Sequence, residues 1–161
     1  MTFLYIRKSV SLFLLLLLCA AGTVSAQDLD AYWDEVSRTV AEGDFEGYAV
    51  LYHEDAVLVS DFSESSVPIA TALKNWKSGF DDTKAGKMTA SVVFRFSTEY
   101  VGEETAFSRG IFRYASAKEG EAENAQYINF EALLVKKDVW LMVMESQLSI
   151  ATEEAWNALA E

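Results

Sequence analysis

The chain has 161 residues, of which 51% are hydrophobic, and it carries 25 acidic residues against 13 basic residues and one histidine. The formal charge of −12 at pH 7 repels phosphate backbones and anionic lipid, so nucleic acid is not expected as a partner. Cys19 is the only cysteine, which leaves no pair for a disulfide, and packing alone must hold the fold together.

The N-terminus has the pattern of a secretory signal peptide. Arg7 and Lys8 form a short basic region, and residues 12–21 form an apolar run dominated by leucine. Small residues then lead to a cleavage site near Ala26. The apolar run is too short to span a membrane, so we predict cleavage and export to the periplasm or the extracellular space.

This pattern divides the chain into a signal peptide over residues 1–26 and one domain over residues 27–161. The mature chain keeps 11 basic against 25 acidic residues, a formal charge of −14. A lipoprotein signal ending at Cys19 is an alternative, but the preceding residue, Leu18, is not small. An uncleaved anchor is a third alternative.

Two helices are expected first. Apolar residues recur at helical spacing over residues 28–41, and Gly43 ends that helix. Asp44 is a candidate N-cap for a second helix over residues 45–52. A short strand, rich in β-branched residues, follows over residues 56–59.

A polar loop over residues 61–66 leads into a third amphipathic helix. Ser66 and Pro68 open this helix, which runs to about Ala85, and Gly86 stops it. From here the hydrophobic period changes from that of a helix to that of a strand.

Four long strands are predicted over residues 88–100, 104–116, 125–136 and 139–149. The first and second strands, and the third and fourth, are joined by short links, so they form antiparallel hairpins. Thr152 is a candidate cap for a short C-terminal helix. Helices followed by an antiparallel sheet give an α+β fold.

Residues 42–60 carry a resemblance to a known family. They contain a helix end, a Gly-Asp break, a second short helix, the acidic turn Glu54-Asp55 and then a strand. This order resembles the start of the nuclear transport factor 2-like superfamily, which includes ketosteroid isomerase and SnoaL-like polyketide cyclases. The resemblance implies a cone-shaped α+β domain with a pocket between the third helix and the sheet.

The resemblance also assigns positions to the residues of ketosteroid isomerase. Its general base falls on Ser60, with Asp61 next in the chain, and its oxyanion-binding tyrosine falls on Val36, with Tyr32 one turn earlier. Its second oxyanion donor falls on Glu131. Since two of the three positions depart from the family, steroid isomerisation by that mechanism is not expected.

Glu131 is the carboxylate that we single out for chemistry. If it faces an apolar cavity it resists ionisation, and with Tyr127 and Asn129 it could orient a ligand carbonyl or hydroxyl. The alternative is an ion pair with Arg109 or Arg113 on the neighbouring strand. With these arginines and Asp61, a weaker parallel to limonene epoxide hydrolase is also open.

Tyr52 and Trp76 are candidate walls of the pocket, and Arg109 and Arg113 are candidate ligand contacts. His53 has no second histidine or mature cysteine to share a metal ion with, so no metal or other cofactor is expected.

Two classes of function remain. The first is a non-catalytic protein that binds a small, largely apolar molecule. The second is a SnoaL-like isomerase, cyclase or hydrolase that uses Glu131 and Asp61 as acid and base. A third, weaker option is an assembly domain whose cavity is filled by its own aromatic side chains. A homodimer through the outer face of the sheet is expected, and the alternative is a monomer with the C-terminal helix on that face.

Overall fold

The computed structural model describes residues 21–159, and most of the predicted signal peptide lies outside this range. The described elements are, in order, α1 (Ala21–Glu42), α2 (Phe45–Ala49), β1 (Tyr52–Ser60), β2 (Ser65–Pro68), α3 (Ile69–Lys84), β3 (Met88–Val101), β4 (Thr105–Lys118), β5 (Asn124–Lys136), β6 (Trp140–Ile150) and α4 (Glu153–Ala158). The predicted α+β order is confirmed. Helix α1 begins earlier than predicted, because residues 21–27 continue it toward the N-terminus.

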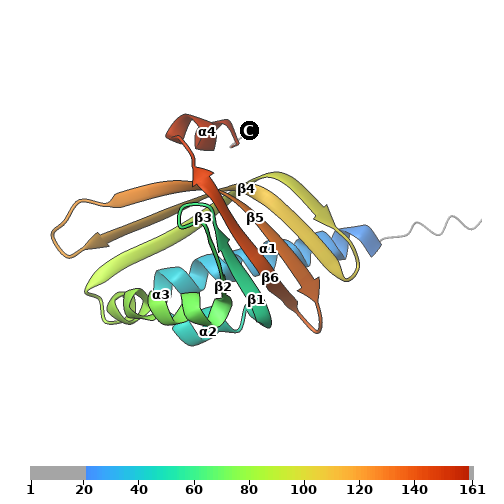
Figure 1. Cartoon of the computed structure of the whole chain (residues 1–161), viewed down its shortest axis with the longest axis horizontal. Helices are drawn as coiled ribbons and strands as arrows, with labels where there is room; N and C mark the ends of the chain where they lie inside the picture. The colour runs from blue at the N-terminus through green and yellow to red at the C-terminus, as the bar shows by residue number, and fades with distance from the viewer. Residues whose placement is uncertain (1–20, 160–161) are drawn as a thin grey trace, which may run out of the picture.

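The strands of this range form one curved sheet in the order β2-β1-β6-β5-β4-β3. All neighbours are antiparallel except β1 and β6, which are parallel. Figure 1 shows α1, α2 and α3 on one face of the sheet, which we call the inner face, and α4 on the opposite, outer face. The two predicted hairpins, β3–β4 and β5–β6, are confirmed.

The break between α1 and α2 is fixed by two residues. Gly43 has a φ of +66°, and a Cβ there would lie 2.5 Å from the carbonyl oxygen of Phe80 on α3, so only glycine fits. Asp44 caps α2 by accepting a hydrogen bond of 3.0 Å from the backbone N–H of Gly47. Helix α2 is shorter than predicted, because Tyr52 already begins β1.

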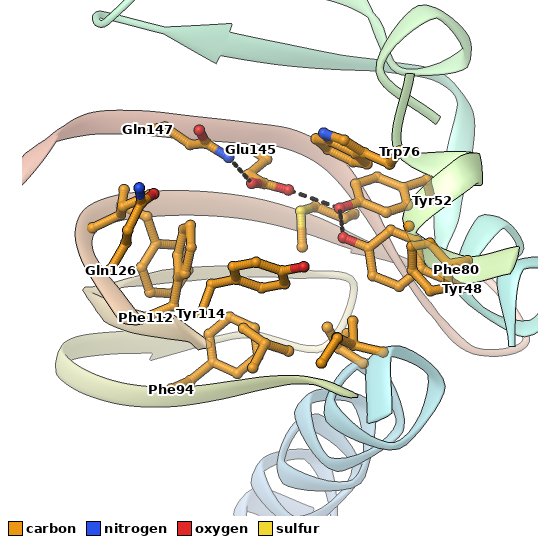
Figure 2. Close-up of a pocket in the computed structure, with 18 of the residues that line it drawn as sticks. Tyr48, Tyr52, Trp76, Phe80, Phe94, Phe112, Tyr114, Gln126, Glu145 and Gln147 are labelled. Atoms are coloured by element: carbon orange, nitrogen blue, oxygen red, sulfur yellow. Dashed lines mark hydrogen bonds between the residues drawn. The ribbon is translucent and has the colours of Figure 1, made fainter. Parts of the chain in front are cut away.

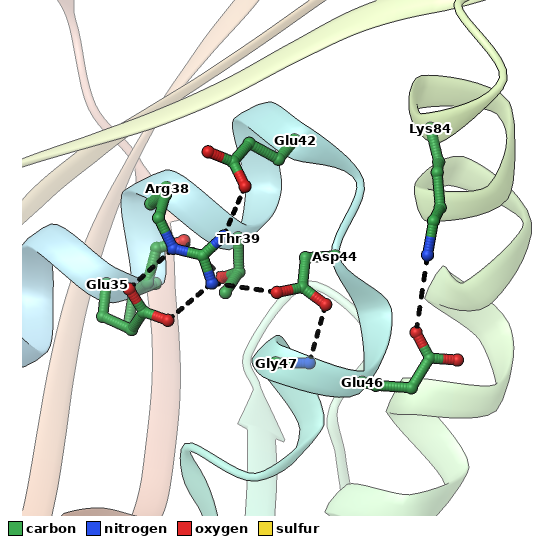
Figure 3. Close-up of polar contacts among 9 residues, drawn as sticks. Glu35, Arg38, Thr39, Glu42, Asp44, Glu46, Gly47 and Lys84 are labelled. Atoms are coloured by element: carbon green, nitrogen blue, oxygen red, sulfur yellow. Dashed lines mark hydrogen bonds and ion pairs between the residues drawn. The ribbon is translucent and has the colours of Figure 1, made fainter.

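A cluster of charges braces this corner of the molecule (Figure 3). Arg38 on α1 bonds to Glu35 at 2.6 Å, to Asp44 at 2.9 Å and also to Glu42. These pairs are substantially exposed, so each contributes little stability. Their effect is positional, because they hold the first turn of α2 against the last turns of α1.

The predicted loop over residues 61–66 is partly wrong. Its last two residues begin β2, a short edge strand that pairs with the end of β1 through Ser60 and Ser65. The stretch is polar and short, so it lacks the hydrophobic alternation that predicts a strand. Helix α3 then begins at Ile69 and ends before Gly86, whose φ is +71°.

Side chains of β5 alternate between the two faces, as predicted. Ile128, Phe130, Ala132 and Leu134 are buried in the core of the inner face. The intervening residues, Tyr127, Asn129, Glu131 and Leu133, therefore lie on the outer face.

The alternation of β6 is interrupted by a β-bulge. Met142 pairs with Leu134, but Met144 pairs with Leu133, so Val143 has no partner on β5. The extra residue shifts the alternation by one position. As a result Met142 and Glu145 both lie on the inner face.

Helix α4 covers one end of the outer face. Thr152 caps it, as predicted, by accepting a hydrogen bond of 3.1 Å from the N–H of Ala155. Trp156 packs with Ile111 in a small second core. The guanidinium of Arg95 lies 4.1 Å from the Trp156 ring centroid and donates to the Trp156 carbonyl oxygen at 2.7 Å. This helix covers only part of the face.

Candidate functional site

A cavity of about 440 Å³ lies between α3 and the inner face of the sheet (Figure 2). Its walls come from α1, α2, α3 and from strands on both sides of the sheet's middle. The lining is mainly aliphatic and aromatic, with polar side chains among them. The polar residues among those described are Tyr48, Tyr52, Asn75, Ser78, Thr83, Tyr114, Gln126, Glu145 and Gln147.

The apolar wall is built from rings that touch one another. Trp33 of α1 lies 4.7 Å from Phe94 of β3, centroid to centroid, and Phe94 lies 5.5 Å from Phe130 of β5. On the other side, Tyr48 of α2 lies 4.9 Å from Phe80 of α3. Such ring contacts fix the shape of the wall and leave the space between the two groups open.

A chain of hydrogen bonds forms the polar part of the cavity (Figure 2). The hydroxyl of Tyr52 donates to Oε2 of Glu145 at 2.7 Å, and the hydroxyls of Tyr52 and Tyr48 lie 2.9 Å apart. Gln147 donates from Nε2 to Oε1 of the same carboxyl at 2.8 Å. Because the hydroxyl of Tyr52 donates its one proton to Glu145, the hydroxyl of Tyr48 is the donor to Tyr52. The three elements α2, β1 and β6 therefore meet at Glu145.

Glu145 is a buried carboxyl, and no ion pair joins it to a basic side chain within residues 21–159. Its residue is 8% exposed, and burial raises its pKa above the ordinary value, while the bonds from Gln147 and Tyr52 lower it by less. Burial likewise raises the pKa values of Tyr48 and Tyr52, so both phenols stay protonated near neutral pH. Among the described lining residues none is Lys, Arg or His.

Two of the predicted ligand-wall residues lie where we expected. Tyr52 and Trp76 both line the cavity, and Tyr52 belongs to its hydrogen-bond chain. Val36, the position that the resemblance assigns to an oxyanion-binding tyrosine, lines the cavity with an apolar side chain. Tyr32, one turn earlier, instead donates its hydroxyl to the carbonyl oxygen of Leu51 at 3.2 Å.

The expectation that Glu131 faces the cavity is wrong. Glu131 lies on the outer face of β5, and its carboxylate pairs at 2.6 Å with Arg109 on β4, one of the two partners named in the alternative. Tyr127 and Asn129 share that outer face, so Tyr127, Asn129 and Glu131 do not line the cavity. The physical reason is that the inner positions of β5 are the even-numbered, apolar ones.

The remaining predicted residues also lie away from the cavity. Arg113 lies on the outer face and pairs with Glu123. Asp61 is exposed in the turn after β1, where its backbone N–H donates to the Gln147 carbonyl oxygen at 3.0 Å. Arg109 points to Glu131 and to the ring of Phe107. None of these side chains lines the cavity in the described part of the chain.

Glu145 was not among the predicted site residues, and its sequence position predicted only that it lies in a strand. Simple alternation from the buried Trp140 and Met142 puts even-numbered residues inside and Glu145 outside. The bulge at Val143 reverses this, and nothing in the local sequence marks a bulge. A signal was present, however, because Glu145 is the one charged residue of an otherwise apolar or neutral strand.

Two further properties bear on the chemistry that the described residues allow. Over residues 21–159, no group of three or more His, Cys, Asp or Glu side chains is placed to hold a metal ion. No helix in that range has the length and apolar character needed to span a membrane.

No family model and no curated protein matches the sequence. Solved structures do match. A nuclear transport factor 2-like protein with a cystatin-like fold from Novosphingobium aromaticivorans has a TM-score of 0.61 at 14% identity, covering 86% of this chain and 90% of that one. A nuclear transport factor 2-like protein of unknown function from Shewanella oneidensis has a TM-score of 0.58 at 16% identity, covering 77% and 98%.

A ketosteroid isomerase-like protein from Erwinia carotovora atroseptica has a TM-score of 0.55 at 14% identity, covering 80% of this chain and 95% of that one. At such identities the likeness concerns the fold alone. The chain has the nuclear transport factor 2-like, ketosteroid isomerase-like fold, with N-terminal helices packed on a curved, mostly antiparallel sheet and a short C-terminal helix. This confirms the resemblance predicted from residues 42–60.

Proposed function

We propose that this chain is an exported protein that binds a small, largely apolar molecule in the cavity beneath its sheet. The observation that carries the proposal is the cavity itself: about 440 Å³, walled mainly by aromatic and aliphatic side chains, with polar residues that include Glu145 and its hydrogen-bond donors Tyr52 and Gln147. This composition is typical of small-molecule sites, where apolar walls supply affinity and a few polar groups set orientation.

An acid–base enzyme is the second candidate, and Glu145 is the observation that favours it. Burial raises the pKa of Glu145, and a buried carboxyl with a raised pKa, bonded to Tyr52, can act as a proton donor as well as an acceptor. It takes the role that we had expected of Glu131. Binding without turnover is favoured, because the described lining offers no second carboxylate and no base to complete an acid–base pair.

A neutral, apolar fluorophore tests the proposal. Nile red should bind the wild-type protein with a rise in fluorescence as it leaves water. Ala90→Phe should abolish this binding, because Ala90 lines the cavity and a phenyl ring there would occupy its space. Leu133→Asp, on the exposed outer face, is the matched control and should leave binding unchanged. Nile red binding that survives Ala90→Phe would contradict the proposal.

The outer face of the sheet supports a separate proposal, which concerns oligomeric state. We propose a homodimer through the part of the outer face that α4 leaves uncovered. Tyr100, Phe107 and Leu133 lie side by side there on three neighbouring strands, and Tyr100 and Leu133 are exposed. Large exposed apolar side chains that adjoin one another are typical of protein interfaces.

A further inference from the structure

The cavity contains one charged group and offers it no partner of opposite charge. Glu145 is the only carboxyl among the described lining residues, and none of the others is basic. By contrast, the half-buried carboxylate of Glu131 on the outer face is paired with Arg109. A buried carboxylate without a cation is costly to keep ionised. The described lining residues therefore supply no counter-charge to Glu145.

The carboxyl of Glu145 can accept more hydrogen bonds than the protein gives it. Each of its oxygens accepts one bond, Oε2 from Tyr52 and Oε1 from Gln147. An ionised carboxylate offers about four acceptor positions, so roughly half remain for a ligand. A ligand ammonium group could take two of them.

Aromatic rings surround the same end of the cavity. Tyr48 lies 5.5 Å from Tyr52 and 6.2 Å from Trp76, centroid to centroid, and all three line the space beside Glu145. Figure 2 shows the hydroxyl of Tyr114 pointing across the cavity toward Tyr48. Aromatic faces attract cations, and they do so most strongly where water is excluded.

The whole chain favours a cation as well. Its formal charge of −12 attracts cationic ligands and repels anionic ones before they reach the cavity. A ligand carboxylate would also meet Glu145 as a like charge, without any basic residue of the lining to offset it.

We propose that the molecule bound in this cavity carries a protonated amine on an apolar body, with Glu145 as its counter-ion. This inference rests on the proposed function, because it names the class of ligand for the same cavity. The apolar body fills the space between the two groups of rings, and the ammonium group donates to the free positions of the Glu145 carboxylate.

The proposal predicts that ligand binding is coupled to a change in the protonation of Glu145. Burial raises the pKa of Glu145, whereas an ammonium group beside the carboxyl favours its ionised form and lowers that pKa, so amine binding is coupled to proton release. Affinity for the amine should therefore rise with pH through the pKa of Glu145 and then level off. The titratable groups that face Glu145 are Tyr32, Tyr48, Tyr52 and Tyr114. Burial raises the pKa values of the first three, so they do not compete in this range.

Isothermal titration calorimetry with three matched probes tests the proposal: tryptamine, which is cationic, tryptophol, which is neutral, and indoleacetate, which is anionic. The wild-type protein should bind tryptamine roughly tenfold or more tighter than tryptophol, and should bind indoleacetate most weakly. Titrations in buffers of different ionisation enthalpy should show proton release when tryptamine binds, but not when tryptophol or indoleacetate binds.

Three variants test whether Glu145 and the cavity cause the preference for tryptamine and the proton release. Glu145→Gln keeps an oxygen for Tyr52 but removes the charge, so the preference for tryptamine and the proton release should both disappear. Glu46→Gln removes one exposed charge from α2 and should leave both unchanged. Ala90→Phe should abolish binding of all three probes. Circular dichroism of each variant confirms that it is folded.

The outcomes separate this inference from the proposed function. Equal affinity for tryptamine and tryptophol, or a preference for tryptamine that survives Glu145→Gln, would overturn the inference of an amine ligand. The proposed small-molecule site would still stand. Tryptamine binding that survives Ala90→Phe would place the amine on the acidic surface and overturn the inference. If Nile red and all three probes fail to bind, both proposals are wrong.

Discussion

The buried carboxyl of Glu145 makes the stability of the folded protein depend on pH. Its pKa is raised in the folded protein by burial, whereas in the unfolded chain it has its ordinary value, near 4.5. Below the unfolded pKa both states hold the proton, and the group does not oppose folding. As the pH rises through the folded pKa, the unfolded state has already lost its proton, and stability falls.

Glu145→Gln should remove this dependence. The free energy of unfolding of the variant, relative to the wild type, should increase from about pH 4.5 through the folded pKa of Glu145 and then stay constant. Urea denaturation over a pH series measures it. Two parallel stability curves would mean that Glu145 is not desolvated as the structure has it.

Tyr52 is the central member of the hydrogen-bond chain. Tyr52→Phe deprives Oε2 of Glu145 of its donor and Tyr48 of its partner, so it should cost about 1–3 kcal/mol. Tyr48→Phe removes only the terminal hydroxyl and should cost about 0.5–1.5 kcal/mol. Urea denaturation at neutral pH compares them, and the reverse order of cost would contradict the direction of the chain.

At the scale of the elements, periodicity predicted most of the fold because most elements keep a regular hydrophobic period. Helices α1 and α3 and the two hairpins follow such periods, and glycines mark the helix ends. The candidate site was predicted less well, because a bulge at Val143 decides which residues of β6 face the cavity. The error at Glu131 has a different cause: apolar residues lie on both faces of β5, with Leu133 on the face of Glu131 and Phe130 on the other, so the pattern alone did not exclude Glu131 from the cavity.

Gly43 holds the junction of α1, α2 and α3. Gly43→Ala should destabilise the protein by about 3 kcal/mol, because the methyl group meets the backbone of α3 and the φ is positive. Gly79→Ala is the control: no atom lies within 4 Å of the added carbon, and alanine is the better helix former, so it should stabilise by about 0.5–1 kcal/mol. Thermal and urea denaturation measure both changes, and equal effects would refute the close contact at Gly43.

At the scale of the whole molecule, the two faces of the sheet have different roles in our account. The inner face, with α1 to α3, encloses the cavity, and the outer face carries ion pairs, α4 and an exposed apolar region. This division explains why the polar residues first chosen on β5 belong to the surface, and why ligand binding and dimer formation can be altered independently.

Sedimentation velocity tests the proposed dimer. The wild type should sediment as a dimer, and Leu133→Asp should shift it to a monomer by placing a charge in the exposed apolar region. Val50→Asp introduces the same charge at a more exposed site just after α2 and should leave the dimer intact. A wild-type protein that sediments as a monomer would contradict the proposed dimer.

The central claim is that the space between α3 and the sheet is an open cavity that holds a ligand. A high-resolution crystal structure of the mature protein grown with tryptamine tests it most directly. We predict density for the ligand in this space, with its nitrogen within hydrogen-bond distance of the Glu145 carboxylate. A cavity closed by the protein's own side chains, with Trp76, Phe80 and Phe94 turned into it, would contradict the account.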